Sequence, residues 1–111
     1  MAEYEMTRID RRGLVTPKNR LTAAVVPEVQ AKLRSLLSEG VDEVVFDLAD
    51  TVMVDSSGMG LLIAAANSLA RTNGTVRVVN ASPDILDLLR SMRLTERLNV
   101  SGRAEQGALR E

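Results

Sequence analysis

The hydrophobic and polar positions along the chain follow two different spacings. Short apolar runs, some with an every-second-residue pattern, are typical of β-strands. In the first run Tyr4 and Met6 share one face, whereas Ile9 falls on the other. The run around Phe46 is almost continuously apolar, which predicts a strand buried on both faces of a sheet. The predicted strands are residues 4–9, 14–16, 44–48 and 75–79.

Three longer segments place apolar residues at helical spacing. The first begins near Pro27, which suits a first helical turn, and ends at Gly40, a common helix stop. The second begins after Asp55, and the third begins at Ser82, a capping residue followed by proline. The predicted buried faces are Val29, Leu33, Leu36 and Leu37 in the first, Met59, Leu62, Ile63, Ala66 and Leu69 in the second, and Ile85, Leu86, Leu89 and Met92 in the third.

Strands that alternate with helices predict one α/β domain, which fits a chain of 111 residues. We expect a mostly parallel four-stranded sheet, with the first hairpin supplying an antiparallel edge strand and the helices packed on the sheet. Residues 18–24 are expected to form a loop before the first helix. The domain should span residues 1–100. Residues 101–111 are polar apart from Leu109, which predicts a mobile tail.

Composition narrows the possible functions. The chain has neither His nor Cys, so a Ser-His-Asp triad cannot form. A net charge of −1 and two aromatic residues argue against a nucleic-acid surface. The apolar runs are too short to cross a membrane, and no signal peptide is evident, so we expect a cytoplasmic protein that binds no membrane. Neither nucleotide-binding loop motif is present, and we expect no cofactor. Asp47, Asp50 and Asp55 could form a metal site, although such residues commonly serve as turn and cap residues.

The segment from Asp55 to Gly60 is the candidate functional site. Ser56 and Ser57 have one simple interpretation, which is capping of the helix that follows. The alternative is that a serine here is the substrate of a partner kinase. A serine nucleophile needs a base or a lowered pKa, and the sequence offers little of either, so we expect no enzyme. Gly58 and Gly60 lack a Cβ and would allow another group to approach closely.

The sequence Asp55-Ser56-Ser57-Gly58-Met59-Gly60, preceded by the apolar run 44–48, resembles the STAS domain of bacterial anti-sigma factor antagonists. The resemblance implies that the unphosphorylated protein binds and sequesters an anti-sigma factor. It implies that this factor, a serine kinase, phosphorylates Ser57 and is then released, and that a PP2C-like serine phosphatase restores the first state. We therefore expect partner switching that regulates transcription through a sigma factor.

The resemblance also implies a set of partner-binding residues, with no catalytic residue or metal ligand among them. They are Asp55, Ser56, Ser57, Gly58, Met59, Gly60 and Thr22. On this basis we expect Gly58→Val to weaken partner binding more than folding, and we expect a monomer or a weak dimer.

Thr22 departs from the family pattern. The family usually has Gly-x-Leu-Asp where this chain has Asn19, Arg20, Leu21 and Thr22, so a hydroxyl replaces a carboxylate near the phosphorylated serine. The change could alter partner choice or phosphorylation rate, or Thr22 could simply bond nearby backbone.

The alternative function is that of a STAS adaptor subunit in a lipid-transport or stressosome-like complex.

Overall fold

The computed structural model describes residues 3–102 and contains two sheets and three helices within that range. Five strands form the main sheet, in the order β1-β2-β4-β6-β7, and β3 pairs with β5 in a separate small sheet. The elements are β1 (Tyr4–Ile9), β2 (Arg12–Pro17), β3 (Asn19–Leu21), α1 (Val26–Ser38), β4 (Glu43–Asp47), β5 (Thr51–Val54), α2 (Ser56–Ala70), β6 (Thr75–Ala81), α3 (Pro83–Ser91) and β7 (Val100–Gly102).

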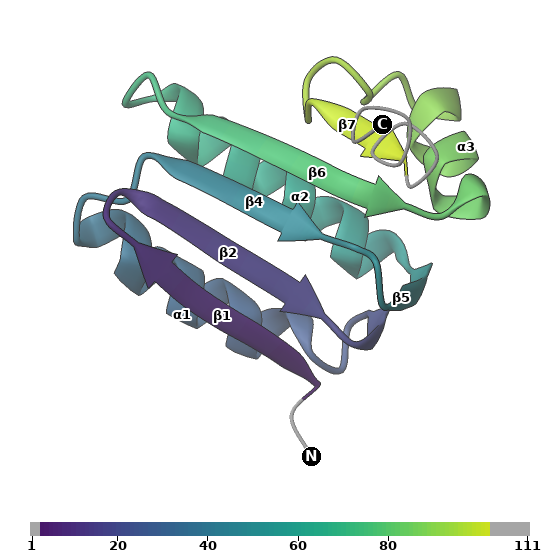
Figure 1. Cartoon of the computed structure of the whole chain (residues 1–111), viewed down its shortest axis with the longest axis horizontal. Helices are drawn as coiled ribbons and strands as arrows, with labels where there is room; N and C mark the ends of the chain where they lie inside the picture. Colours follow the sequence, from purple (N-terminus) through teal and green to yellow (C-terminus); the bar gives the residue numbers. More distant parts are fainter. Residues whose placement is uncertain (1–2, 103–111) are drawn as a thin grey trace, which may run out of the picture.

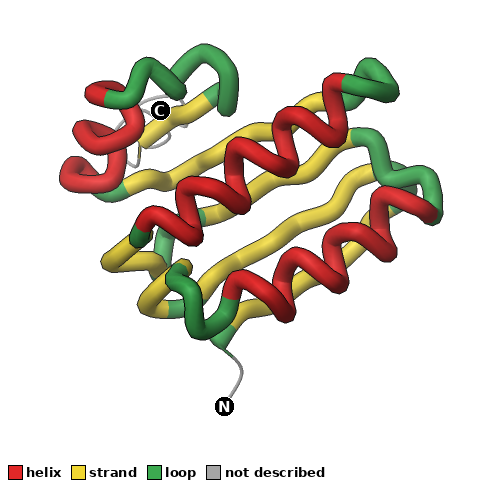
Figure 2. The backbone as a smooth tube through the Cα atoms, turned by 180° about the vertical axis from the view of Figure 1, so that it is seen from behind, coloured by secondary structure: helices red, strands yellow, loops and turns green. Residues whose placement is uncertain are grey.

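The sheet is mostly parallel, as the sequence predicts. β1 and β2 form an antiparallel hairpin, whereas β2–β4, β4–β6 and β6–β7 are parallel pairs. Helices α1 and α2 lie side by side on one face of this sheet, and α3 lies beside β7 at its far edge (Figures 1 and 2). The predicted fold class is thus confirmed, except that the main sheet has five strands rather than the predicted four. β7 extends the sheet and includes Ser101 and Gly102, and the rest of the predicted tail, residues 103–111, lies outside the described residues.

The core lies between the main sheet and the helices. Val44 and Phe46 of β4 are fully buried under the helices, whereas Val45, on the opposite face, is only half-buried. The prediction that this strand is buried on both faces is therefore wrong, because α1 and α2 cover only one face (Figure 2).

The predicted helix faces need several corrections, and among them Leu36 and Leu37 of α1 and Leu86 of α3 are only half-buried. In α2 the buried face includes Leu61 and Ala65, and Ile63 is only half-buried. Met92 is 46% exposed because α3 ends at Ser91 and Met92 already lies at its C-cap. Gly40 ends α1 as predicted, with a φ of +99° that favours glycine. Within residues 3–102 no helix is both long and apolar enough to span a bilayer.

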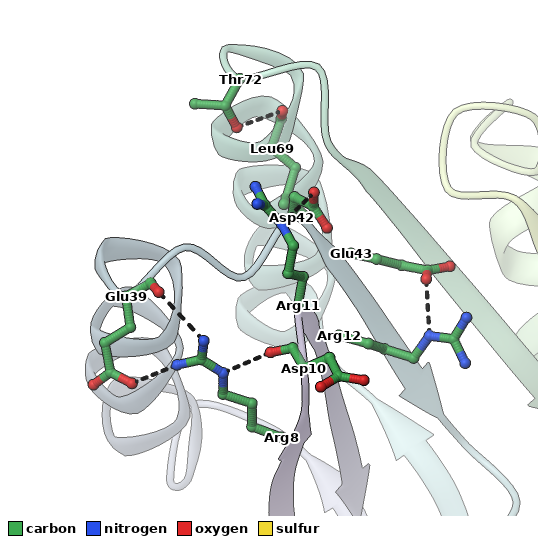
Figure 3. A network of polar contacts seen from close by, with 9 residues as sticks. All are labelled: Arg8, Asp10, Arg11, Arg12, Glu39, Asp42, Glu43, Leu69 and Thr72. Carbon is green, nitrogen blue, oxygen red and sulfur yellow. Dashed lines mark hydrogen bonds and ion pairs between the residues drawn. The ribbon is translucent and has the colours of Figure 1, made fainter.

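Exposed ion pairs surround the β1–β2 turn (Figure 3). Arg8 bonds Glu39 at 2.9 Å, joining β1 to the end of α1. The other two pairs join the turn to the start of β4, and they are Arg11–Asp42 at 3.0 Å and Arg12–Glu43 at 2.8 Å. Each exposed pair stabilises the fold by about 0–1 kcal/mol. These contacts lie at the end of the sheet opposite the start of α2.

Candidate functional site

The candidate site lies where α2 begins, beyond the carboxyl end of β4. Asp55 is the N-cap of α2, with an extended backbone, and its Oδ1 accepts a hydrogen bond from Gly58 N at 2.9 Å. The interpretation of the serines as caps is therefore wrong, since Ser56 and Ser57 are already the first two residues of the helix. Both hydroxyls are left available because the aspartate satisfies the helix end.

Asp55 also holds the loop between β3 and α1 against this helix end. Its Oδ2 accepts from Ala23 N at 3.1 Å, and its own N–H donates to Leu21 O at 3.3 Å. These bonds favour the ionised carboxylate, so the pKa of Asp55 lies below its usual range, chiefly through Gly58 N–H and then Ala23 N–H. One side chain thus fixes two backbone segments whose residues are far apart in the sequence.

The small β3–β5 sheet brings Thr22 to the site, and it was not predicted from the sequence. β3 falls inside the expected loop 18–24 and runs parallel to β5, pairing Leu21 with Val54. Asn19 has a φ of +68°, as the tolerance of asparagine for this conformation suggested. The buried Thr51 supports the connection, because its Oγ1 donates to Pro17 O at 3.0 Å.

The two glycines have different environments. A Cβ on Gly58 would lie 2.2 Å from Leu21 O and 2.8 Å from Val54 Cγ1, so β3 packs directly on this glycine. A Cβ on Gly60 would meet nothing within 4 Å, and Gly60 is exposed. The expectation for Gly58→Val is therefore reversed: the substitution should lower folding stability more than partner binding, because Gly58 packs against β3. Gly60 is the glycine that another molecule can approach.

The remaining predicted residues divide by exposure. Ser56 is exposed and Ser57 is half-buried, and neither hydroxyl makes a hydrogen bond within residues 3–102. Thr22 is half-buried, and its carbonyl accepts from Val25 N and Val26 N. Met59 is only 5% exposed, so its side chain belongs to the core rather than to an accessible surface.

Two exposed apolar residues next to the serines were missed. Val52 and Met53 of β5 are 69% and 45% exposed, just before the cap at Asp55. Exposed apolar side chains beside a helix start are candidates for contact with a partner. The burial of β5 does not alternate, because Thr51 and Val54 are buried and the two residues between them are exposed, so the period of two that identifies a strand in a sequence is absent here.

The acidic residues near the site act as turn and pairing residues. Asp47 Oδ1 accepts from Ala49 N and from Asn80 Nδ2, each at 3.0 Å. Asp50 pairs with Lys18 at 3.1 Å, and with Glu5 it raises the pKa of that lysine. In the part of the chain that the structure describes, no group of three or more His, Cys, Asp or Glu side chains could hold a metal ion.

The family model of the STAS domain matches residues 3–106 of the chain. No curated protein sequence gives a significant match. Among solved structures, TM1081 of Thermotoga maritima has a TM-score of 0.82 at 15% identity, covering 95% of this chain and 92% of that one. The anti-sigma factor antagonist SpoIIAA in its unphosphorylated form gives 0.71 at 19% identity, with 78% and 81% covered. An anti-sigma factor antagonist of Mycobacterium paratuberculosis gives 0.77 at 16%, with 97% and 93% covered.

Proposed function

The chain belongs to the STAS domain family, whose members of this type are regulatory binding proteins rather than enzymes, and we propose that it is an anti-sigma factor antagonist controlled by phosphorylation of Ser57. In the unphosphorylated state it binds an anti-sigma factor that is also a serine kinase. That kinase transfers phosphate from ATP to the Ser57 hydroxyl and is released. A PP2C-like serine phosphatase hydrolyses the phosphoserine and restores binding.

One observation carries the proposal. Ser57 lies in the first turn of α2 with a hydroxyl that makes no hydrogen bond within residues 3–102, because Asp55 caps the helix instead. A kinase can accept such a hydroxyl without first breaking a contact of the fold. The half-buried position also means that a partner covering Ser57 would enclose it completely.

The proposed contact surface consists of Val52, Met53, Ser56, Ser57 and Gly60, with Thr22 at its border. Exposed apolar side chains on β5 supply area to bury, and the open space at Gly60 allows a partner backbone to come close. Gly58 and Met59 are buried, so they are not part of this surface and support it from the core side.

Phosphorylation should change binding rather than fold. A phosphoserine adds a charge of about −1.5 to −2. The α2 N-terminus favours this anion by about 0.3–1 kcal/mol, and the neighbouring Asp55 carboxylate opposes it by a similar amount. The two effects nearly cancel for the free protein. An unpaired dianion enclosed in an interface costs several kcal/mol, and about 1.4 kcal/mol is already a tenfold change in affinity.

Three variants used as baits for cross-linked pull-downs from the native cells test the proposal. Ser57→Ala should capture an ATPase of the histidine-kinase fold and never carry phosphate, whereas Ser57→Asp should capture much less. Ser56→Ala is the matched control and should behave as wild type. Phosphopeptide mass spectrometry of the wild-type protein should place the phosphate on Ser57. Equal capture by Ser57→Ala and Ser57→Asp would rule out the switch.

The second candidate is an adaptor subunit of a lipid-transport or stressosome-like complex. It rests on membership of the same domain family rather than on the serine. Capture of a transporter subunit or of a large STAS assembly, with no dependence on the Ser57 variants, would favour it.

A further inference from the structure

Strand β1 has an outer edge that no described residue pairs with. The two-residue turn at Asp10 makes Ile9–Arg12 the first hydrogen-bonded pair of the hairpin, and bonded pairs then occur at every second residue. The bond from Lys18 N to Glu3 O, at 2.8 Å, fits this alternation. The backbone N–H and C=O groups of the intervening residues therefore point away from β2. These residues, which we term the β1 edge, are Tyr4, Met6 and Arg8.

Strand β1 has few of the features that prevent strand pairing, although Glu5 and Arg8 are charged. The six residues of β1 include no proline, glycine or lysine, and the register of β1 with β2 is unbroken. The opposite edge strand, β7, has three residues and an irregular register with β6. Of the two edges of the main sheet, β1 is thus the one suited to accept another strand.

We propose that β1 pairs antiparallel with β1 of a second copy of this chain, about a twofold axis at Met6. Centring the pair on Met6 lets all three outward-facing residues form hydrogen bonds, with Tyr4 opposite Arg8 of the second copy. Centring it on Glu5 would place like charges opposite each other, which is destabilising. Centring it on Thr7 would leave Tyr4 without a bonded partner.

The side chains flanking the edge are complementary under this pairing. Tyr4 Oη donates to Glu28 Oε2 at 2.8 Å, so Arg8 of the second copy, which pairs with Glu39 of its own chain at 2.9 Å, would lie next to a second carboxylate. Glu28 is well exposed, and its only ion pair within residues 3–102 is a long 4.0 Å contact with Lys32. A groove of about 640 Å³ between β1 and α1 offers room for the incoming side chains.

The pairing keeps both helical layers on one side of a continuous sheet, because residues that face each other lie on the same face of the two sheets. It uses none of the residues of the proposed contact surface around Ser57. The inference is therefore independent of the proposed function, and each can fail without the other.

Sedimentation velocity over a concentration series, up to about 1 mM, should show a reversible monomer–dimer equilibrium. Met6→Pro should weaken the dimer at least about tenfold, because it removes an outward N–H and leaves the bonds to β2 intact. Ile9→Ser is the control, since Ile9 is exposed but directs its backbone toward β2. Arg8→Glu should also weaken the dimer, and adding Glu28→Arg to it should restore pairing.

Cysteine cross-linking checks the register directly, because the natural chain has no cysteine. Met6→Cys should form a disulfide-linked dimer under mild oxidation, whereas Ser91→Cys, exposed on α3, should not at the same concentration. A monomer at every concentration overturns the proposal. So does a dimer that Ile9→Ser disrupts while Met6→Pro and Arg8→Glu leave it intact.

Discussion

Replacing Gly58 by alanine tests whether this glycine serves the fold. The new Cβ would lie 2.2 Å from Leu21 O, where ordinary contact begins near 3.4 Å, so the β3 backbone must retreat by more than 1 Å. That movement strains the hydrogen bonds that tie the loop to Asp55. Overpacking of this kind costs about 1–3 kcal/mol and each weakened bond about 1 kcal/mol. Alanine in a helix returns about 1 kcal/mol.

We therefore expect Gly58→Ala to lose roughly 3 kcal/mol of folding free energy. The matched control is Gly60→Ala, two residues further along the same helix, which should gain about 0.5–1 kcal/mol because its Cβ would meet nothing. Urea unfolding followed by far-UV circular dichroism measures both, and the melting temperature should shift by about 4–8 °C per kcal/mol. If Gly58→Ala proves as stable as Gly60→Ala, the close packing of β3 on α2 is incorrect.

Three further predictions concern the fold around the site. The lowered pKa of Asp55 stabilises the protein above the ordinary aspartate value of 3.8, and this contribution is lost as the pH falls below it; the urea midpoint of Asp55→Asn should thus fall less between pH 5 and 3 than that of the wild type, and parallel curves would contradict this. Thr51→Val should cost about 1–2 kcal/mol through the buried bond to Pro17 O, and an unchanged urea midpoint would mean that this bond adds nothing. A chain ending at Gly102 should melt like the full chain, whereas one ending at Asn99 lacks β7 and should melt lower; equal melting of the two truncated chains would show that β7 adds no stability.

The sequence predicts the long elements of this fold well. Residues 4–9 form β1 with the predicted bounds. As predicted, Pro27 lies in the first turn of α1 and Gly40 follows its C-terminal end. Helices of nine or more residues and a six-residue strand contain enough positions for their periods to be evident. The short strands β3, β5 and β7 contain three or four residues each, so they become evident only from their partners.

The details of the site depend on helix phase and on cap position. Aspartate and serine are both good N-caps, and only the structure assigns the role to Asp55. Gly58 precedes the buried Leu61 and Leu62 by three and four residues, which is a signal that it faces the core. Gly60 has the same relation to the less buried Ala64. This spacing therefore distinguishes the packed glycine, Gly58, from the exposed one, Gly60.

The use of Asp55 as the cap has a consequence for the lifetime of the protein. If the modified serine were itself the N-cap, every phosphorylation cycle would exchange the hydrogen bonds at the start of α2, and each exchange would be an opportunity for local opening and proteolysis. Here the bonds that hold the helix end belong to the neighbouring carboxylate, so phosphate can be added to Ser57 and removed without opening the domain. Under the proposed function, one molecule could therefore pass through many cycles, and its abundance would not depend on how often it is used.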